Sequence, residues 1–323
     1  MSYFKLAFIL LCVSAACTYN VAYSAGVKLH KAEKVGMSSE RLEKLAALGD
    51  RYIDNGNYSG LVTLVARNGK IVHLDAHGNY GIDDTKPMAT DTLFRIYSMT
   101  KPVTAVAAMM LYEEGKFHMN DPVSKYLPAF ADQKVLVDGK LVAPQSPMLM
   151  RQLFTHTAGL TYGFTADNPV DIEYQKAQLF QSKNLDEFIS KLADLPLRYQ
   201  PGERYHYSVS MDVLGAVIEK LSGMPLDEFY HSRIFQPLDM EDTFFEVPAS
   251  KRDRLASDQY WDAQTSKVTT MPVERSRSYN KVSLFMGGGG LVSTAYDYFR
   301  FSQMVLNGGE LEGVRILLSL IHI

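Results

Sequence analysis

Ser98 and Lys101 place a hydroxyl nucleophile one helical turn from an amine. If a helix begins at Ser98, the two side chains share one face of it, because residues three apart are neighbours on a helix surface. Serine alone is a poor nucleophile, but a neutral lysine can take its proton, and the free N–H groups of a helix N-terminus can hold an oxyanion. The pair therefore predicts nucleophilic catalysis by Ser98; the alternative is a capping serine beside a surface lysine.

The surroundings of this pair separate it from other copies of the same pattern. Ser-x-x-Lys occurs in the chain at positions 2/5, 98/101 and 278/281. The first copy precedes an apolar run at the N-terminus, and the third lies in a polar, charged segment. Only the second is followed by residues that are apolar on nearly every side, 103–112, which indicate a buried helix. A helix start at that point would hold the nucleophile rigidly.

A second proton-handling group is available in residues 201–208, where a Pro-Gly turn precedes Tyr205, His206 and Tyr207. Tyrosine can relay protons when cationic neighbours lower its pKa. The residues alone do not distinguish the three side chains, and each is equally explained by ordinary packing. A Ser-His-Asp mechanism on an α/β-hydrolase fold has no support, because Gly-x-Ser-x-Gly does not occur in the chain.

Four consecutive glycines at 287–290 are the next unusual feature. No Gly-Lys-Ser/Thr follows them, so a phosphate-binding loop is not predicted. One interpretation is a flexible bend. The other is close backbone approach beside a site, since glycine has no Cβ to obstruct it.

A metal site is not expected. His73 and His77 are four residues apart, but their segment is typical of a strand that runs into a turn. His-Glu-x-x-His, which would place two ligands on one helix face, occurs nowhere in the chain.

Composition sets the outer limits of function. The chain has 323 residues, enough for a large core and about two domains, and its 46% apolar and 21% charged residues indicate a globular protein. A formal net charge of -3 and a pI near 6.3 give no electrostatic reason to expect nucleic acid or an anionic membrane surface as a partner. Small neutral substrates remain possible.

The N-terminus has the layout of an export signal. Lys5 precedes an apolar run at residues 6–17, too short to span a bilayer, and small residues follow through Ala25. We expect residues 1–25 to be a signal peptide and the protein to be secreted or periplasmic; the alternative is a lipoprotein anchored through Cys17. Both cysteines lie in this segment, so an exported mature protein would have no disulfide.

Hydrophobic spacing predicts an α+β fold. A helix at 37–53, capped by Ser38, precedes two strands at 61–66 and 71–74 around an Asn68-Gly69 turn. Further helical spacing occurs at 121–128, 186–195, 213–221, 226–235 and 297–307. No strong strand signal interrupts the middle of the chain. We therefore expect a mostly helical insert, about 98–283, between two pieces of a sheet domain, about 36–95 and 284–317, with the nucleophile where they meet.

The ordered set of motifs resembles the serine β-lactamase-related family, and most closely its family VIII carboxylesterases and class C-like members. The resemblance covers roughly residues 35–317. It rests on Ser98-Met99-Thr100-Lys101, then on His156-Thr157-Ala158-Gly159-Leu160, Pro201-Gly202 before Tyr207-Ser208, and Gly288-Gly289-Gly290-Leu291.

The resemblance implies a β-lactamase/D,D-peptidase-like fold and an acyl-enzyme mechanism. Ser98 would attack an ester or lactam carbonyl, Lys101 and Tyr207 would manage the protons, and water would release the acyl group. Matching by motif is what selects Tyr207 over Tyr205. The Ser98 N–H would supply half of an oxyanion hole, and no metal or organic cofactor is implied.

Two departures from the family pattern qualify this expectation. Class C lactamases carry Tyr-x-Asn where this chain has Tyr207-Ser208-Val209, so the amide that would bind a lactam side chain is absent. That difference favours a carboxylesterase on small acyl esters over the alternatives, a β-lactamase or D,D-peptidase. The third family motif, of the Lys- or His-Thr-Gly type, is not found after the glycines, and the ending at 318–323 is atypical. We therefore expect this chain to be impaired, and a non-catalytic binding or scaffold relative stays possible.

Overall fold

The computed structural model describes residues 27–271 and 276–318. The predicted signal peptide, Cys12 and Cys17 lie outside the described residues, as does most of the atypical tail. Within the described ranges, no helix is both long enough and apolar enough to cross a membrane.

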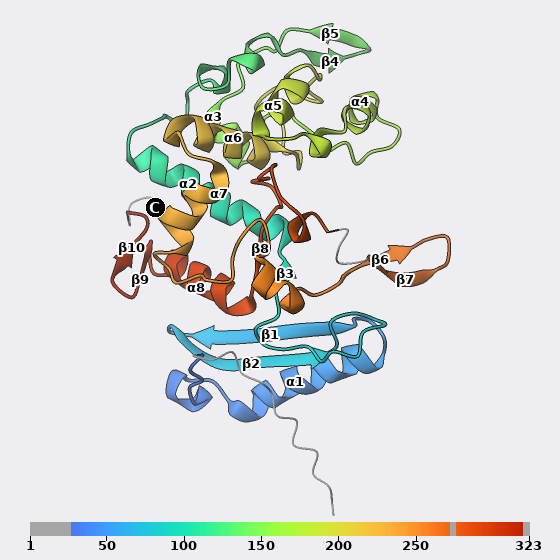
Figure 1. Cartoon of the computed structure of the whole chain (residues 1–323). Helices are drawn as coiled ribbons and strands as arrows, with labels where there is room; N and C mark the ends of the chain where they lie inside the picture. The colour runs from blue at the N-terminus through green and yellow to red at the C-terminus, as the bar shows by residue number, and fades with distance from the viewer. Residues whose placement is uncertain (1–26, 272–275, 319–323) are drawn as a thin grey trace, which may run out of the picture.

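The N-terminal unit is a helix packed on a hairpin. After a short 3-10 helix, Ala32–Val35, come α1 (Ser39–Asp54), β1 (Gly60–Arg67) and β2 (Lys70–Gly78). The Ser38 side chain accepts a hydrogen bond from the Arg41 N–H at 3.2 Å, which confirms the predicted cap. Both turn residues, Asn68 and Gly69, have positive φ, as the two-residue type I′ turn of a tight hairpin requires. The hairpin lies between α1 and α8 (Ala295–Leu306), with α1 against β2 and α8 against β1 (Figure 1).

A short strand pair joins the two pieces of the sheet domain. β3 (Phe94–Arg95) pairs antiparallel with β8 (Val292–Ser293), so segments almost two hundred residues apart lie side by side. A last hairpin, β9 (Glu310–Leu311) with β10 (Val314–Arg315), follows α8. The described residues form five separate two-stranded antiparallel pairs, and the predicted α+β class is confirmed.

The predicted buried helix is α2 (Thr100–Glu113), which crosses the middle of the molecule (Figure 1). Its side chains at Val103, Ala107 and Leu111 are at most 1% exposed. It packs against α6 (Ser210–Ser222), whose apolar residues are buried almost as completely. The apolar character on every side, which the sequence showed, follows from this position between neighbours.

The middle of the chain contains further helices. The predicted ones include α5 (Leu185–Ala193) and α7 (Leu226–Tyr230), the latter continuing as a π-helix at His231–Phe235. Two more, α3 (Met150–Phe154) and α4 (Pro169–Ala177), were not predicted. Single turns of 3-10 helix occur at Val123–Lys125, Pro128–Asp132, Leu179–Gln181, Ala249–Arg254 and Arg277–Tyr279. The predicted helices at 121–128, 186–195, 213–221 and 226–235 are thereby confirmed, although their boundaries differ by a few residues.

The expectation that no strand interrupts this region was wrong. Two hairpins lie in it: β4 (Val135–Val137) with β5 (Lys140–Val142), and β6 (Asp258–Asp262) with β7 (Lys267–Met271). The β6–β7 hairpin projects from the body of the molecule (Figure 1). Its Trp261 is 63% exposed, so its strands lack the alternation of a half-buried sheet on which the prediction depended. An overlooked signal for the first hairpin was Asp138-Gly139, both with positive φ.

The helical core predicts a contrast between two leucines. Leu214 in α6 is fully buried, whereas Leu306 at the end of α8 is 78% exposed. We expect Leu214→Ala to lower the free energy of unfolding by about 2–5 kcal/mol, because it removes buried methyl groups and leaves a cavity. Leu306→Ala is the matched control and should change it by less than about 0.5 kcal/mol. Urea unfolding of both variants checks this, and equal losses would contradict the described core.

Candidate active site

The candidate nucleophile sits on a strained turn. Tyr97, directly before Ser98, has φ 43°, a left-handed conformation that costs a residue with a Cβ roughly 1–3 kcal/mol. Two contacts hold it: the Ile96 N–H donates to the Leu291 carbonyl at 3.0 Å, and the Tyr97 hydroxyl donates to Asp258. The turn ends in the one-turn 3-10 helix Tyr97–Met99, which leads straight into α2. Ser98 is therefore exposed at the N-terminal end of a buried helix.

Ser98 has two polar partners. Its Oγ lies 2.5 Å from the Tyr207 hydroxyl oxygen and accepts a hydrogen bond from Lys101 Nζ at 3.1 Å. The ammonium also lies over the Tyr207 ring, 4.6 Å from its centroid. The structure thus brings together the three predicted site residues, with two groups able to exchange protons with one hydroxyl.

The contact with Ser98 distinguishes the three side chains that sequence reasoning left open. Tyr205 is 65% exposed. His206 directs Nε2 to the Thr161 hydroxyl at 3.1 Å. Tyr207 alone of the three is hydrogen-bonded to Ser98.

His156 supports Tyr207 from behind. Its ring lies 4.9 Å from the Tyr207 ring, and its Nδ1 accepts a hydrogen bond from the Ser208 N–H at 3.2 Å. Its carbonyl accepts from the His206 N–H at 2.8 Å, so both neighbours of Tyr207 are tied to one residue. Burial, with the Lys101 charge adding to it, lowers the pKa of His156 to about 4. A neutral imidazole therefore positions Tyr207 at pH 7.

The glycine stretch approaches the site closely, as the second interpretation of it predicted. Lys101 Nζ donates to the Gly288 carbonyl at 2.5 Å, and the Gly288 N–H donates to Asp212 Oδ1 at 2.9 Å. A Cβ on Gly288 would lie 2.5 Å from Asp212 Oδ2, so a side chain there would require Asp212 or the loop to shift. The backbone of Gly288, through the peptide groups on its two sides, therefore connects the candidate base to a buried carboxylate in α6.

A buried hydroxyl pair fixes the preceding glycine. The Tyr230 hydroxyl donates to Thr104 Oγ1 at 2.7 Å, and Thr104 Oγ1 donates to the Gly287 carbonyl at 2.6 Å. Tyr230 and Thr104 are both fully buried. Together with Asp212, they hold the loop on α2 and α6 through backbone atoms.

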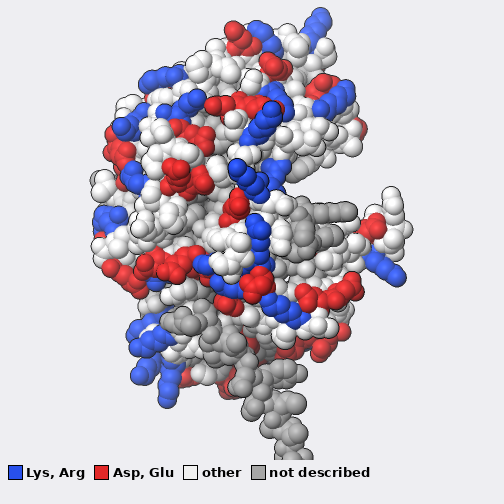
Figure 2. Space-filling model, viewed as in Figure 1, with Lys and Arg blue, Asp and Glu red and all other residues white. Residues whose placement is uncertain are grey.

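Aromatic rings form one side of the site. Tyr162 lies 5.2 Å from the Tyr207 ring and stacks on Phe164 at 5.0 Å, and the Lys101 ammonium is 5.4 Å from its centroid. The N-terminal end of α2 points to the side of the molecule from which the β6–β7 hairpin projects (Figure 1). The surface is hollowed on that side, between the hairpin and the lobe of α3–α6, and charges of both signs are interspersed over the face shown (Figure 2).

Sequence reasoning missed Asp212 and Tyr162. Asp212 is 1% exposed, and burial raises its pKa to about 6. Burial, followed by the charge of Asp212, raises the pKa of Tyr162 as well. A signal was available for Asp212, because it stands among apolar residues at the start of α6, where an acidic side chain must find a partner.

The remaining sequence motifs have structural explanations. His77 Nδ1 lies 2.7 Å from Asp50 Oδ1, and His73 Nε2 lies 2.7 Å from the Thr63 hydroxyl. Residues 27–271 and 276–318 contain no cluster of three or more His, Cys, Asp or Glu side chains that could hold a metal ion. Ser278 is buried with its hydroxyl 3.0 Å from that of Ser276, and the copy of the pattern at 2/5 lies outside the described residues.

Comparison with known proteins relates the chain to one family. A family model described as Beta-lactamase matches residues 45–321. Protein Rv1367c of Mycobacterium tuberculosis is 38% identical over 269 residues, 82% of this chain and 66% of that protein. Esterase EstB of Burkholderia gladioli is 33% identical over 255 residues, 78% of this chain and 61% of that protein. The chain thus spans just under two thirds of the length of these curated relatives.

A solved structure extends the likeness to the fold. EstCE1, described as a hydrolase with promiscuous acyltransferase activity, matches with a TM-score of 0.73 at 29% identity. The match covers 85% of this chain and 74% of that one. It confirms the predicted fold.

The burial of Asp212 predicts a pH-dependent stability. Its pKa of about 6 in the folded protein exceeds the ordinary value near 4, so the folded state holds a proton that the unfolded chain releases between pH 4 and 6. Stability is therefore lost as the pH rises through that window. Asp212→Asn cannot titrate, and its amide oxygen can still accept from Gly288.

We expect the wild type to lose about 3 kcal/mol in free energy of unfolding relative to Asp212→Asn when the pH rises from 4 to 7. Urea unfolding at several pH values measures the difference. Asp186→Asn, whose carboxylate is 74% exposed, controls for net charge. A difference in free energy of unfolding between wild type and Asp212→Asn that does not change with pH would show that Asp212 is not buried as described.

Proposed function

The chain belongs to the beta-lactamase family, and on this basis we propose that it is a serine hydrolase that forms an acyl-enzyme on Ser98 and acts on small acyl esters. The single observation that carries the proposal is the contact of Ser98 Oγ with Tyr207 at 2.5 Å and with Lys101 at 3.1 Å. The likeness to esterase EstB and to the hydrolase EstCE1 supports it.

The acylation step uses these contacts. Tyr207, or Lys101 as a neutral amine, takes the proton of Ser98 as Oγ attacks the carbonyl carbon. The oxygen of the resulting tetrahedral intermediate lies at the N-terminal end of α2, where the Ser98 N–H is one donor of an oxyanion hole. When the intermediate collapses, the bond to the alcohol oxygen breaks, and that oxygen receives the proton now held by Tyr207 or Lys101.

The deacylation step runs through the same groups. A water molecule gives its proton to Tyr207 or Lys101 and attacks the acyl carbonyl. The bond between the acyl carbon and Ser98 Oγ then breaks, Oγ regains a proton, and the free acid leaves. The Gly288 carbonyl keeps the Lys101 nitrogen in place throughout, because it accepts from Nζ at 2.5 Å.

The residue two positions after Tyr207, Val209, favours esters over lactams. Val209 is fully buried and apolar, so no amide at this position faces a substrate. A β-lactamase or D,D-peptidase activity is the alternative, and a non-catalytic binding protein is the alternative of a different class. We also propose that residues 1–25 direct export, or that Cys17 carries a lipid.

A labelling experiment with matched variants tests the function. A fluorophosphonate should label wild-type protein at Ser98, and p-nitrophenyl butyrate should be hydrolysed much faster than nitrocefin. We expect Ser98→Ala to abolish labelling and to lower ester turnover by at least about 1,000-fold. Tyr207→Phe should lower kcat by roughly 100- to 10,000-fold, because it removes a proton relay.

Tyr205→Phe is the control for Tyr207, since the side chain of Tyr205 is exposed and two residues away. It should retain turnover within about twofold of wild type. Faster turnover of nitrocefin than of the ester would favour the lactamase. Absence of both labelling and turnover in folded protein would indicate either a binding protein or an oxyanion hole that is incomplete without the third family motif.

A further inference from the structure

A cavity of about 310 Å³ lies beside the turn that carries the candidate nucleophile, and its lining includes Arg95, Tyr97, Arg277 and Gly289. Tyr97 directly precedes Ser98, and Gly289 directly follows the glycine whose carbonyl binds Lys101. Ser98, Lys101 and Tyr207 do not themselves line the cavity, so a substrate group would enter it past Tyr97 and Gly289.

Among the residues that the structure describes, the charged side chains that line the cavity are those of Arg95, Arg277 and Asp258. Asp258 already accepts a hydrogen bond from the Tyr97 hydroxyl. Arg95 donates to the Ser276 hydroxyl at 2.6 Å and to the Ala256 carbonyl at 2.7 Å. Its remaining terminal nitrogen, Nη2, is buried without a hydrogen-bond partner. An unpaired buried donor on a charged group is costly unless an anion comes close.

Arg277 is the more accessible of the two arginines. It donates to the backbone carbonyl of Phe180, and its Nη1 lies 3.3 Å from the Met286 sulfur. Neither acceptor, the Phe180 carbonyl oxygen or the Met286 sulfur, carries a negative charge. In the described part of the chain, no carboxylate forms an ion pair with Arg95 or Arg277, whereas most other arginines with side-chain contacts do have such a partner.

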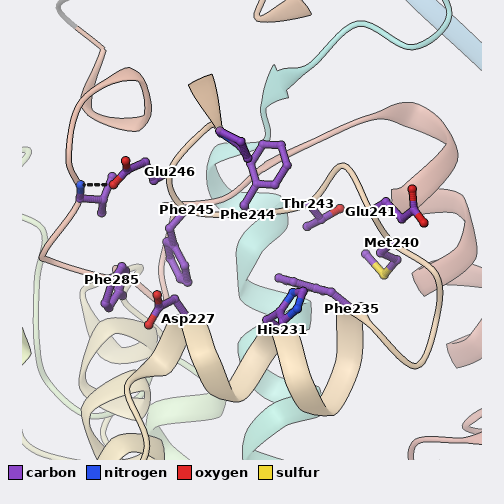
Figure 3. A pocket seen from close by; sticks show the side chains of 12 residues that line it. Asp227, His231, Phe235, Met240, Glu241, Thr243, Phe244, Phe245, Glu246 and Phe285 are labelled. Atoms are coloured by element: carbon purple, nitrogen blue, oxygen red, sulfur yellow. Dashed lines mark hydrogen bonds between the residues drawn. The ribbon is translucent and has the colours of Figure 1, made fainter. Parts of the chain in front are cut away.

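The neighbouring cavity shows that this positive charge is local. That cavity, of about 390 Å³, shares Phe245 and Val282 with the cavity beside Ser98. The described residues that line it include Asp227, Glu241 and Glu246 but no lysine or arginine (Figure 3). The Glu246 carboxylate is turned to the Val282 N–H at 2.9 Å (Figure 3). Of two adjoining cavities, the one beside Ser98 carries the arginines.

We infer that the cavity beside Ser98 binds a carboxylate of the substrate, so that the preferred esters carry a carboxylate on the acyl or the alcohol group. This inference rests on the proposed esterase function and names the substrate class of the same site. Arg277 faces the carboxylate with its guanidinium, and Arg95 adds positive charge from behind. The aromatic side chains Phe180 and Phe245 line the remaining, apolar part of the cavity.

The test compares ester pairs that differ in one carboxylate. On the acyl side, the pair is mono-4-nitrophenyl adipate and 4-nitrophenyl hexanoate; on the alcohol side, it is 5-acetoxy-2-nitrobenzoate and 4-nitrophenyl acetate. The wild type should prefer the anionic member of at least one pair. Arg277→Gln should reduce that preference about 10-fold through KM, with the neutral ester unchanged.

Three further variants separate charge from structure. Arg277→Lys keeps the charge and should retain the preference within about threefold, whereas Arg277→Glu should reverse it. Arg41→Gln removes the same charge from an exposed position in α1 and should change neither ratio. A preference that Arg277→Gln and Arg277→Glu leave unaltered in both pairs would overturn the inference.

Binding measurements keep the two hypotheses distinguishable. If the wild type hydrolyses no ester of either pair, the proposed function fails. Equilibrium dialysis of mono-4-nitrophenyl adipate and 4-nitrophenyl hexanoate with Ser98→Ala protein then tests the cavity alone. Tighter binding of the adipate, lost when Arg277→Gln is added, would support the carboxylate site without the esterase; equal binding would refute it.

Discussion

The site depends on the backbone of one residue, Gly288. Its carbonyl accepts a hydrogen bond from the Lys101 ammonium, and its N–H donates to the Asp212 carboxylate. Both bonds are charge-assisted, and such bonds are roughly twice as strong as those between neutral groups. The carbonyl and the N–H belong to the two peptide groups on either side of the Gly288 Cα, so one residue holds an amine in α2 and a carboxylate in α6 at the same time.

The need to hold Gly288 in place explains several features that are otherwise unconnected. A Cβ at residue 287 or 288 would lie 2.5 Å from an atom of Met211 or Asp212 in α6, and a Cβ at residue 290 would lie 2.8 Å from the Phe245 ring. The loop leads into β8, so the β3–β8 pair holds its C-terminal end next to the strand that leads to Ser98. The Gly287 carbonyl accepts from Thr104, which in turn accepts from Tyr230, and both of these side chains are buried. The core, the strand pair and the glycines thus serve one geometry.

Sequence reasoning was most successful where the geometry is local. Ser98 and Lys101 are within one helical turn, so their spacing alone placed them together, and the helix that follows was evident from its apolar residues. Tyr207 lies 109 residues from Ser98, and only the family resemblance selected it. The Gly288 carbonyl escaped prediction, because a contact through a backbone atom leaves no residue pattern to read. Asp212 was missed although its place among apolar residues was a readable signal. The exposed β6–β7 hairpin escaped it too, since its strands bury no alternating apolar face.

The separation of these segments along the chain has a consequence for synthesis. Gly288 is 187 residues C-terminal to Lys101, so at about 5–20 residues per second the ribosome needs roughly 10–40 s to supply it after the lysine. The nucleophile and the amine therefore emerge well before the loop that fixes the amine. A nascent chain carries Ser98 in an unassembled state until that loop has been made. Closure of the β3–β8 pair is a non-local, late event that brings the reactive serine into its finished surroundings.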